Sequence, residues 1–126
     1  MKRLWLGLLI LVLLLAGSIL IQMLLYKVHR SIAQDLEQAA LSALVQDWQA
    51  SISLARTALS RWQRWHHFTA AFADHTPMDE LDGLFSQLPV YAQNREDPHF
   101  AATCKELSFL ANAMAESHRL SWWNFL

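Results

Sequence analysis

Histidines and carboxylates gather in one stretch of this sequence, and side chains of these types could bind a metal ion. The six residues are His66, His67, Asp74, His75, Asp79 and Asp82. Imidazole nitrogens and carboxylate oxygens are common ligands of zinc and iron. Within this stretch, however, no H-x-x-x-H or E-x-x-H pair sets two ligands on one helix face. His66, His75, Asp79 and Asp82 are therefore weak metal candidates, and the sequence predicts no metal and no other cofactor.

Each of these side chains also has a structural explanation. Asp79 and Asp82 follow the start of a predicted helix at Thr76, where acids interact favourably with the helix dipole. His75 is expected to hydrogen-bond a carboxylate such as Asp79, and His66 to have one ring nitrogen satisfied. No activated nucleophile accompanies a base anywhere in the sequence, so we predict no catalytic residue and no enzymatic activity.

Three tryptophans, Trp48, Trp62 and Trp65, could form an aromatic surface for a peptide or a cation. Trp48 and Trp62 belong to an apolar stripe with spacings of four and three residues: Trp48, Ile52, Ala55, Leu59, Trp62 and His66. Large rings between small alanines commonly fill the space between two helices. The pattern thus favours core packing over a binding surface.

The elements that must position these residues are all predicted to be helices. No glycine or proline occurs between Ser18 and Thr76, and good helix formers dominate this segment. The second stripe is preceded by a first one: Ile32, Leu36, Ala39 and Ala43. Between the two stripes Asp47 is a plausible N-cap, which predicts a tight reversal and an antiparallel hairpin. An uninterrupted helix to about Phe72 is the alternative.

Two further helices follow. Thr76-Pro77-Met78-Asp79 is a helix start signal, with a capping hydroxyl, a proline at the first helical position and an early acid. Pro89 is expected to end or kink that helix. Asp97-Pro98 repeats the start signal, and the last helix is expected to end near His118. Its apolar face comprises Phe100, Cys104, Leu107, Ala111 and Met114.

An uncharged, proline-free apolar run extends from Leu4 to Tyr26, long enough to cross a bilayer of about 30 Å as a helix. The predicted membrane anchor includes Leu4, Trp5, Leu15, Ile21 and Tyr26. A cleaved signal peptide is the rival interpretation, but the run is long and no A-x-A pattern follows it. Gln22, inside the run, is expected to reach the headgroups, or to hydrogen-bond across a helix dimer.

The predicted organisation is an anchor with basic flanks at residues 1–30 and one compact domain at residues 31–126. The fold class is all-α, a transmembrane helix followed by a small antiparallel domain of about four helices in two hairpins. All eleven acids fall after Ser31, against six basic residues. A net-acidic domain of this kind excludes nucleic acid as a partner. Basic residues flank both ends of the apolar run, and the N-terminus is predicted inside the cell with the domain outside.

The apolar end of the sequence, Trp122, Trp123, Phe125 and Leu126, needs a partner that buries it. A groove between the hairpins, the headgroup region and another protein are three possible acceptors.

Three features in order resemble a known family. They are the anchor, Trp62-x-x-Trp65 followed by the segment from Asp74 to Asp82, and the ending from Leu120 to Leu126. Together they are similar to an uncharacterised family of short single-span bacterial proteins, the domain of unknown function numbered four-three-six-three. Trp122 and Trp123 depart from the family's ending. The resemblance implies a membrane-anchored helical module and no activity.

The sequence therefore predicts a single-pass protein of the cell membrane that contacts the lipid bilayer and another membrane or envelope protein. In this interpretation it is an interaction or scaffolding module, and its oligomeric state stays open. The alternative function is an envelope sensor of a ligand or metal, using the histidine and aspartate residues between 66 and 82.

Overall fold

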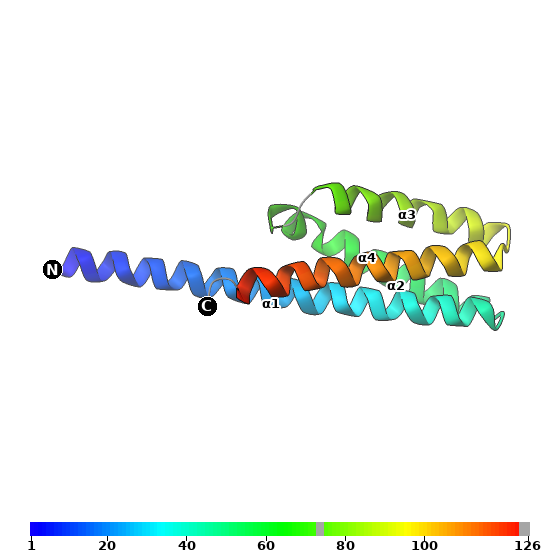
Figure 1. The fold of residues 1–126 in the computed structure, drawn as a ribbon, viewed down its shortest axis with the longest axis horizontal. Coiled ribbons are helices and arrows are strands. Elements are labelled where there is room, and N and C mark those ends of the chain that lie inside the picture. The colour runs from blue at the N-terminus through cyan, green and yellow to red at the C-terminus, as the bar shows by residue number, and fades with distance from the viewer. Residues whose placement is uncertain (73–74, 124–126) are drawn as a thin grey trace.

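The described residues form four α-helices that run back and forth along one axis. The structure, a computed structural model, describes the backbone of residues 1–72 and 75–123, and their side chains except those at 72, 97 and 121–123. The helices are α1 (Lys2–Leu44), α2 (Trp48–Phe72), α3 (His75–Gln93) and α4 (Asp97–Trp123). Figure 1 shows the first part of α1 extending alone beyond the other three helices. The predicted all-α fold, with antiparallel packing and a long apolar N-terminal helix, is confirmed.

The apolar run and the first helix of the domain form one continuous helix. α1 has 43 residues, so it is about 65 Å long. No break occurs between residues 30 and 31, where the sequence analysis placed the domain boundary, and burial begins earlier, at Gln22. Leu4, Trp5 and Leu15 are exposed, as an anchor requires. By length and composition α1 could span a membrane, a test that an N-terminal signal sequence also passes.

The predicted reversal near Asp47 is present. The amide of Asp47 donates to the Ser42 carbonyl over 2.9 Å, and the amide of Gln46 donates to the Ala43 carbonyl over 3.0 Å. This pair of bonds is the Schellman motif that closes many helices. The Asp47 side chain then accepts a hydrogen bond from the Ala50 amide over 3.3 Å, as an N-cap does. The alternative of an uninterrupted helix is wrong.

α3 differs from its prediction at both ends. It begins at His75, one residue before the predicted capping residue Thr76, and it continues through Pro89 for another turn. Proline removes one backbone donor, so the carbonyl of Phe85 loses its usual helical partner. Phe85 and Leu88, before the proline, are nevertheless buried, and Tyr91 and Ala92, after it, are half-buried. Packing on both sides of the proline therefore stabilises the continuous helix. Of the two expected effects, an end of the helix at Pro89 is wrong, and a kink there stays a prediction.

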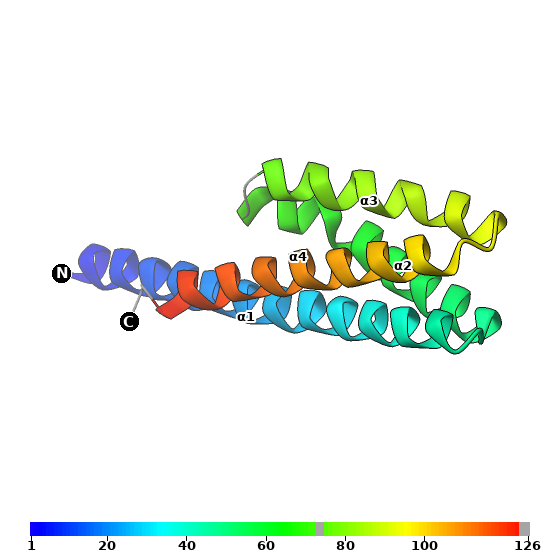
Figure 2. The ribbon, with the colours of Figure 1, turned by 45° about the vertical axis from the view of Figure 1, so that its right-hand side comes forward.

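α1 is the central helix of the bundle, and α4 and α2 pack directly against it. Both figures show α4 running alongside α1 over most of the length of α4 (Figures 1 and 2). α1 presents four fully buried alanines to its neighbours: Ala33, Ala39, Ala40 and Ala43. These small residues let the helices approach closely. As a result the Ser51 hydroxyl donates to the Ala39 carbonyl over 2.7 Å, and the Ser108 hydroxyl donates to the Ala33 carbonyl over 2.8 Å.

The predicted apolar faces of α1 and α4 are buried, but the buried face of α2 is rotated from its prediction. Among the described side chains of α2, the buried ones are Ser51, Ala55, Ala58, Trp62 and Thr69. Ile52 and Leu59, which the stripe placed in the core, are only half-buried. They point instead toward α3, because α3 packs mainly on α4 and leaves a gap beside α2.

Candidate functional site

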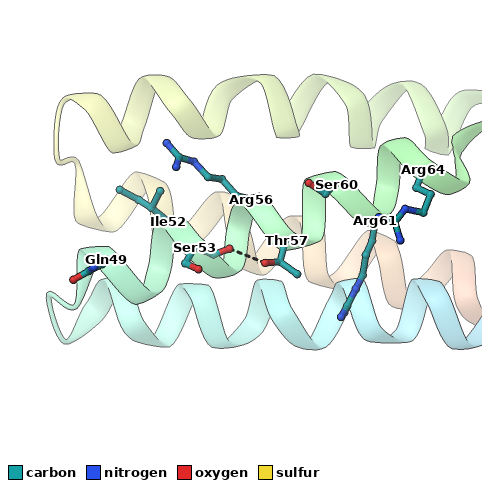
Figure 3. Close-up of a pocket in the computed structure, with 8 residues that line it drawn as sticks. All are labelled: Gln49, Ile52, Ser53, Arg56, Thr57, Ser60, Arg61 and Arg64. Carbon is teal, nitrogen blue, oxygen red and sulfur yellow. Dashed lines mark hydrogen bonds between the residues drawn. The ribbon is translucent and has the colours of Figure 1, made fainter.

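One hollow of the described surface lies along α2. Figure 3 shows this groove over the outer face of α2, with α1 on one side and α3 on the other. Its volume is about 640 Å³, and it is lined by Gln49, Ile52, Ser53, Arg56, Thr57, Ser60, Arg61 and Arg64. All of these residues come from α2, where intervals of three and four place them on one face. We call this feature the arginine groove.

The three arginines of this groove differ in what holds them. Arg61 donates to the Asp35 carboxylate over 2.7 Å and to the Ser31 hydroxyl, so it is held against α1. Arg56 and Arg64 are exposed, and neither forms an ion pair with another described residue. The face therefore carries positive charge that the surrounding described residues do not neutralise.

A second, apolar groove adjoins the first and shares Ile52 and Arg56 with it. Its volume is about 480 Å³, and it is lined by Ile52, Ala55, Arg56, Leu59, Phe85, Leu88, Pro89, Ala92, Gln93 and Phe100. The walls are α2 and α3, and Phe100 of α4 contributes to the lining. We call it the apolar groove. Sequence reasoning missed it because Ile52 and Leu59 have the spacing of core residues, and the gap depends on where α3 packs.

The predicted histidine and aspartate constellation is only partly assembled. His66 of α2 lies 3.1 Å from the Asp82 carboxylate of α3, and the other Asp82 oxygen accepts from the Trp62 ring N–H over 2.6 Å. His75 and Asp79 are exposed and form no hydrogen bond with each other, which corrects the predicted bridge. Among the described residues, no three histidines, cysteines or acids gather in a way that could hold a metal ion.

A buried polar cluster that the sequence analysis did not identify joins three helices where α4 ends. His118 of α4 donates from Nδ1 to the Gln22 side-chain oxygen over 2.6 Å. His29 donates from Nδ1 to the Leu25 carbonyl over 2.6 Å, and its Nε2 lies 3.3 Å from the Thr69 hydroxyl of α2. The two imidazoles stack with their centroids 5.2 Å apart. Gln22 is thus satisfied inside the protein and does not reach the headgroups as predicted.

The two buried histidines are held neutral by their surroundings. Both are 0% exposed. Burial lowers the pKa of His29, although its hydrogen bond to the Leu25 carbonyl opposes this effect. Burial, with a smaller contribution from the neighbouring His29, lowers the pKa of His118 to about 4. Nε2 of His118 is buried without a hydrogen-bond partner among the described atoms, which adds to the cost of this arrangement.

The predicted aromatic residues have different environments. Trp62 is fully buried, as a core residue should be. Trp48 is half-buried and meets Phe100 edge-on at 5.3 Å between centroids. Trp65 is also half-buried and lies beside the exposed Phe68. The side chains of Trp122 and Trp123 and the whole of Phe125 and Leu126 lie outside the described residues.

The fold and these sites define an all-α protein with a long apolar helix at its N-terminus and two connected grooves on its bundle. The family model of a domain of unknown function, DUF4363, matches residues 19–125, and the chain belongs to this family. The match begins inside α1, before the predicted domain boundary. Neither a curated protein nor a solved structure matches the chain.

Proposed function

We propose that this protein is a membrane-anchored interaction module whose two grooves bind a helical segment of another membrane or envelope protein. In this proposal α1 crosses the bilayer once, with the N-terminus inside the cell and the domain outside. The observation that carries the proposal is the apolar groove, where side chains with core-like spacing stay accessible because α2 and α3 diverge.

The shape of the apolar groove suits a helix. Two helices form its walls and an aromatic ring contributes to the lining, which is the arrangement in which amphipathic helices commonly bind. Ile52 and Leu59 are half-buried, and Leu59 also packs against the core. Their remaining apolar surface would contribute about 25 cal/mol per Å² when a partner covers it.

The arginine groove indicates the charge of that partner. Because Ile52 and Arg56 line both grooves, a helix lying on the apolar residues would place one flank beside Arg56 and Arg64. Acidic residues on this flank would complement both arginines, and such complementarity speeds association and selects the partner. We therefore expect an amphipathic segment with carboxylates along one side.

Site-specific crosslinking in native membranes tests this proposal. A photoreactive residue at Ile52 should crosslink one recurring protein through a segment that is apolar on one face and acidic on the next. The matched control is Glu106, an exposed residue of α4 that lines neither groove, and it should not crosslink that protein.

Charge reversal then tests the arginine contribution. Arg56→Glu, introduced beside the reactive residue at position 52, should lower the crosslinking yield about tenfold, which corresponds to about 1.4 kcal/mol. Equal crosslinking from positions 52 and 106 would contradict the groove as a binding site. An unchanged yield in Arg56→Glu would contradict the acidic partner.

The alternative function, a metal-responsive sensor, has less support. Of its four proposed ligands, only His66 and Asp82 approach each other, and Asp82 already accepts a hydrogen bond from Trp62.

A further inference from the structure

We infer that the last turn of α4 enters the bilayer beside α1 and that the end of α2 lies in the headgroup region. The lipid bilayer would then cover this end of the domain. The inference rests on the membrane anchor of the proposed function, but it concerns a different surface from the two grooves.

The register of α4 on α1 places the end of α4 within the apolar run. Three side-chain contacts fix this register: Lys105 with Glu37, Asn112 with Arg30, and His118 with Gln22. α4 continues past His118 to residue 123. At about 1.5 Å per residue this extension is roughly 7 Å, so its end is level with about residue 18 of α1. Figure 1 shows the end of α4 beside α1 at this position.

The length of the exposed part of α1 shows why the bilayer must reach α4. All positions up to Ala16 are exposed, and half-buried positions begin at Gly17. The segment from Leu4 to Ala16 rises about 20 Å as a helix, whereas the hydrocarbon core of a bilayer is about 30 Å thick. The remaining 10 Å must come from residues after Ala16, which are the residues that the last turn of α4 flanks.

The side chains on this part of the surface are apolar. α1 exposes Leu20 by 67% and Leu24 by 45%, and α4 exposes Leu120 by 56%. Leu120 is level with about residue 21 of α1, according to the register above. In water these three leucines would form an apolar surface on two adjacent helices, whereas hydrocarbon would cover them favourably.

The end of α2 lies just outside the hydrocarbon depth that the last turn of α4 would reach. Thr69 lies beside His29, so its neighbour Phe68 is about one helical turn, or roughly 6 Å, beyond the end of the apolar run at Tyr26. Phe68 is 54% exposed. Aromatic rings are favoured at this level of the membrane. Both figures place the end of α2 and the start of α3 at the same end of the bundle as the end of α4.

The polar groups near this end are compatible with membrane contact. Gln22 is the one amide in the apolar run, and His118 satisfies its oxygen inside the protein, which a polar group at this depth requires. Lys27 and Arg30 are exposed immediately beyond the run, at the level of lipid phosphates. Arg119 is exposed as well, and it donates to the Glu116 carboxylate over 2.7 Å. Glu116 lies about one turn nearer the headgroups, so this ion pair directs the arginine toward them.

Accessibility of nitroxide labels tests the inference in the full chain. Single cysteines would replace Leu11, Val45, Phe68 or Leu120, all exposed positions where substitution removes little packing. The protein would be placed in vesicles of phosphatidylcholine and phosphatidylglycerol. Unsubstituted protein is the labelling control, because Cys104 is buried and burial raises the pKa of its thiol to about 12.

Labels at Leu120 and Phe68 should lose collisions with an aqueous nickel reagent relative to Val45, which lies at the turn far from the membrane. The label at Leu120 should also gain collisions with oxygen, approaching the value at Leu11 in the anchor. If labels at Leu120 or Phe68 collided with the nickel reagent as often as the label at Val45, while the label at Leu11 collided mainly with oxygen, the inference would be overturned. The proposed membrane anchor would be unaffected. A water-like value at Leu11 itself would overturn both the inference and the proposed anchor.

Discussion

At the scale of single residues, Asp82 explains why the histidine and aspartate stretch is arranged as it is. Asp82 belongs to α3, and its two carboxylate oxygens contact two residues of α2. One oxygen accepts from the Trp62 ring N–H, and the other lies 3.1 Å from Nε2 of His66. α2 and α3 otherwise pack sparsely, so this carboxylate is a main connection between them. Part of the histidine and aspartate stretch that resembled a metal site therefore connects α2 to α3.

The buried histidines predict that acid destabilises the protein. A histidine with a lowered pKa in the folded state binds fewer protons than it does unfolded, so stability is complete above pH 6.5 and falls as the pH drops toward 4. For His118 alone the loss is on the order of 3 kcal/mol, since each pKa unit corresponds to about 1.4 kcal/mol. Urea unfolding between pH 7.5 and 4 would measure it.

Two variants assign this loss to the buried cluster. His118→Phe keeps a stacked ring but cannot be protonated, so its stability should change much less over the same pH range, although its stability at pH 7.5 will be lower. His67→Gln, at an exposed position, should keep the full acid-induced loss. Equal pH dependence in His118→Phe and the unsubstituted protein would contradict the assignment.

At the scale of helices, α1 and α3 end in the same way. Gln46 and Arg95 both have positive φ, 61° and 51°. In each motif the following residue donates back to a carbonyl five residues earlier, to Ser42 from Asp47 and to Tyr91 from Glu96. Glycine is the usual residue at this position of a Schellman motif, because a Cβ atom is strained there. Both turns therefore contain a local strain.

Replacing Gln46 with glycine should relieve the strain of the first turn. We expect Gln46→Gly to raise the free energy of unfolding by about 0.5–1 kcal/mol, even though glycine makes the unfolded chain more flexible. The neighbouring Val45 is the control, because its φ is −93° and it is exposed. Val45→Gly should destabilise by about 0.5–1 kcal/mol. Thermal unfolding of both variants would measure the difference, and destabilisation by Gln46→Gly would contradict the prediction.

The same helices show what the sequence could predict. Local signals located the reversal at Asp47, and periodicity identified the buried faces of α1 and α4, because each depends on neighbours along the chain. The side on which α3 packs depends instead on residues far away in the sequence. The spacing of Ile52 and Leu59 therefore predicts core positions, and it gives no sign of the grooves. Gln22 was misinterpreted for a similar reason. Its partner, His118, is 96 residues away, and only the register of α4 on α1 brings them together.

At the scale of the whole molecule, the apolar N-terminal run and the domain share one helix and part of one core. Leu25 and His29 are fully buried, although both precede the predicted boundary at residue 30. The family match, which begins at residue 19, includes this segment. We infer that the folded unit begins near Gly17 and that residues 17–30 of α1 belong to the domain, with Leu25 and His29 in its core. No flexible linker separates the two parts in the described chain, so movements of α1 would be transmitted to α4 directly.

A pair of truncated chains tests this boundary. A chain that begins at Gly17 keeps the whole contact between α1 and α4, whereas a chain that begins at Ser31 loses Leu25 and His29 and leaves His118 without Gln22. Burying one leucine contributes about 1.5–3 kcal/mol, and the shorter chain also loses the packing of His29 and the hydrogen bond between His118 and Gln22. The shorter chain should therefore be less stable by at least about 2 kcal/mol in urea unfolding, both chains being measured in the same mild detergent. Leu25→Ala in the longer chain is the matched control and should lose about 2–5 kcal/mol. Equal unfolding midpoints for the two chains would return the boundary to residue 30 and make the first part of α1 an anchor only.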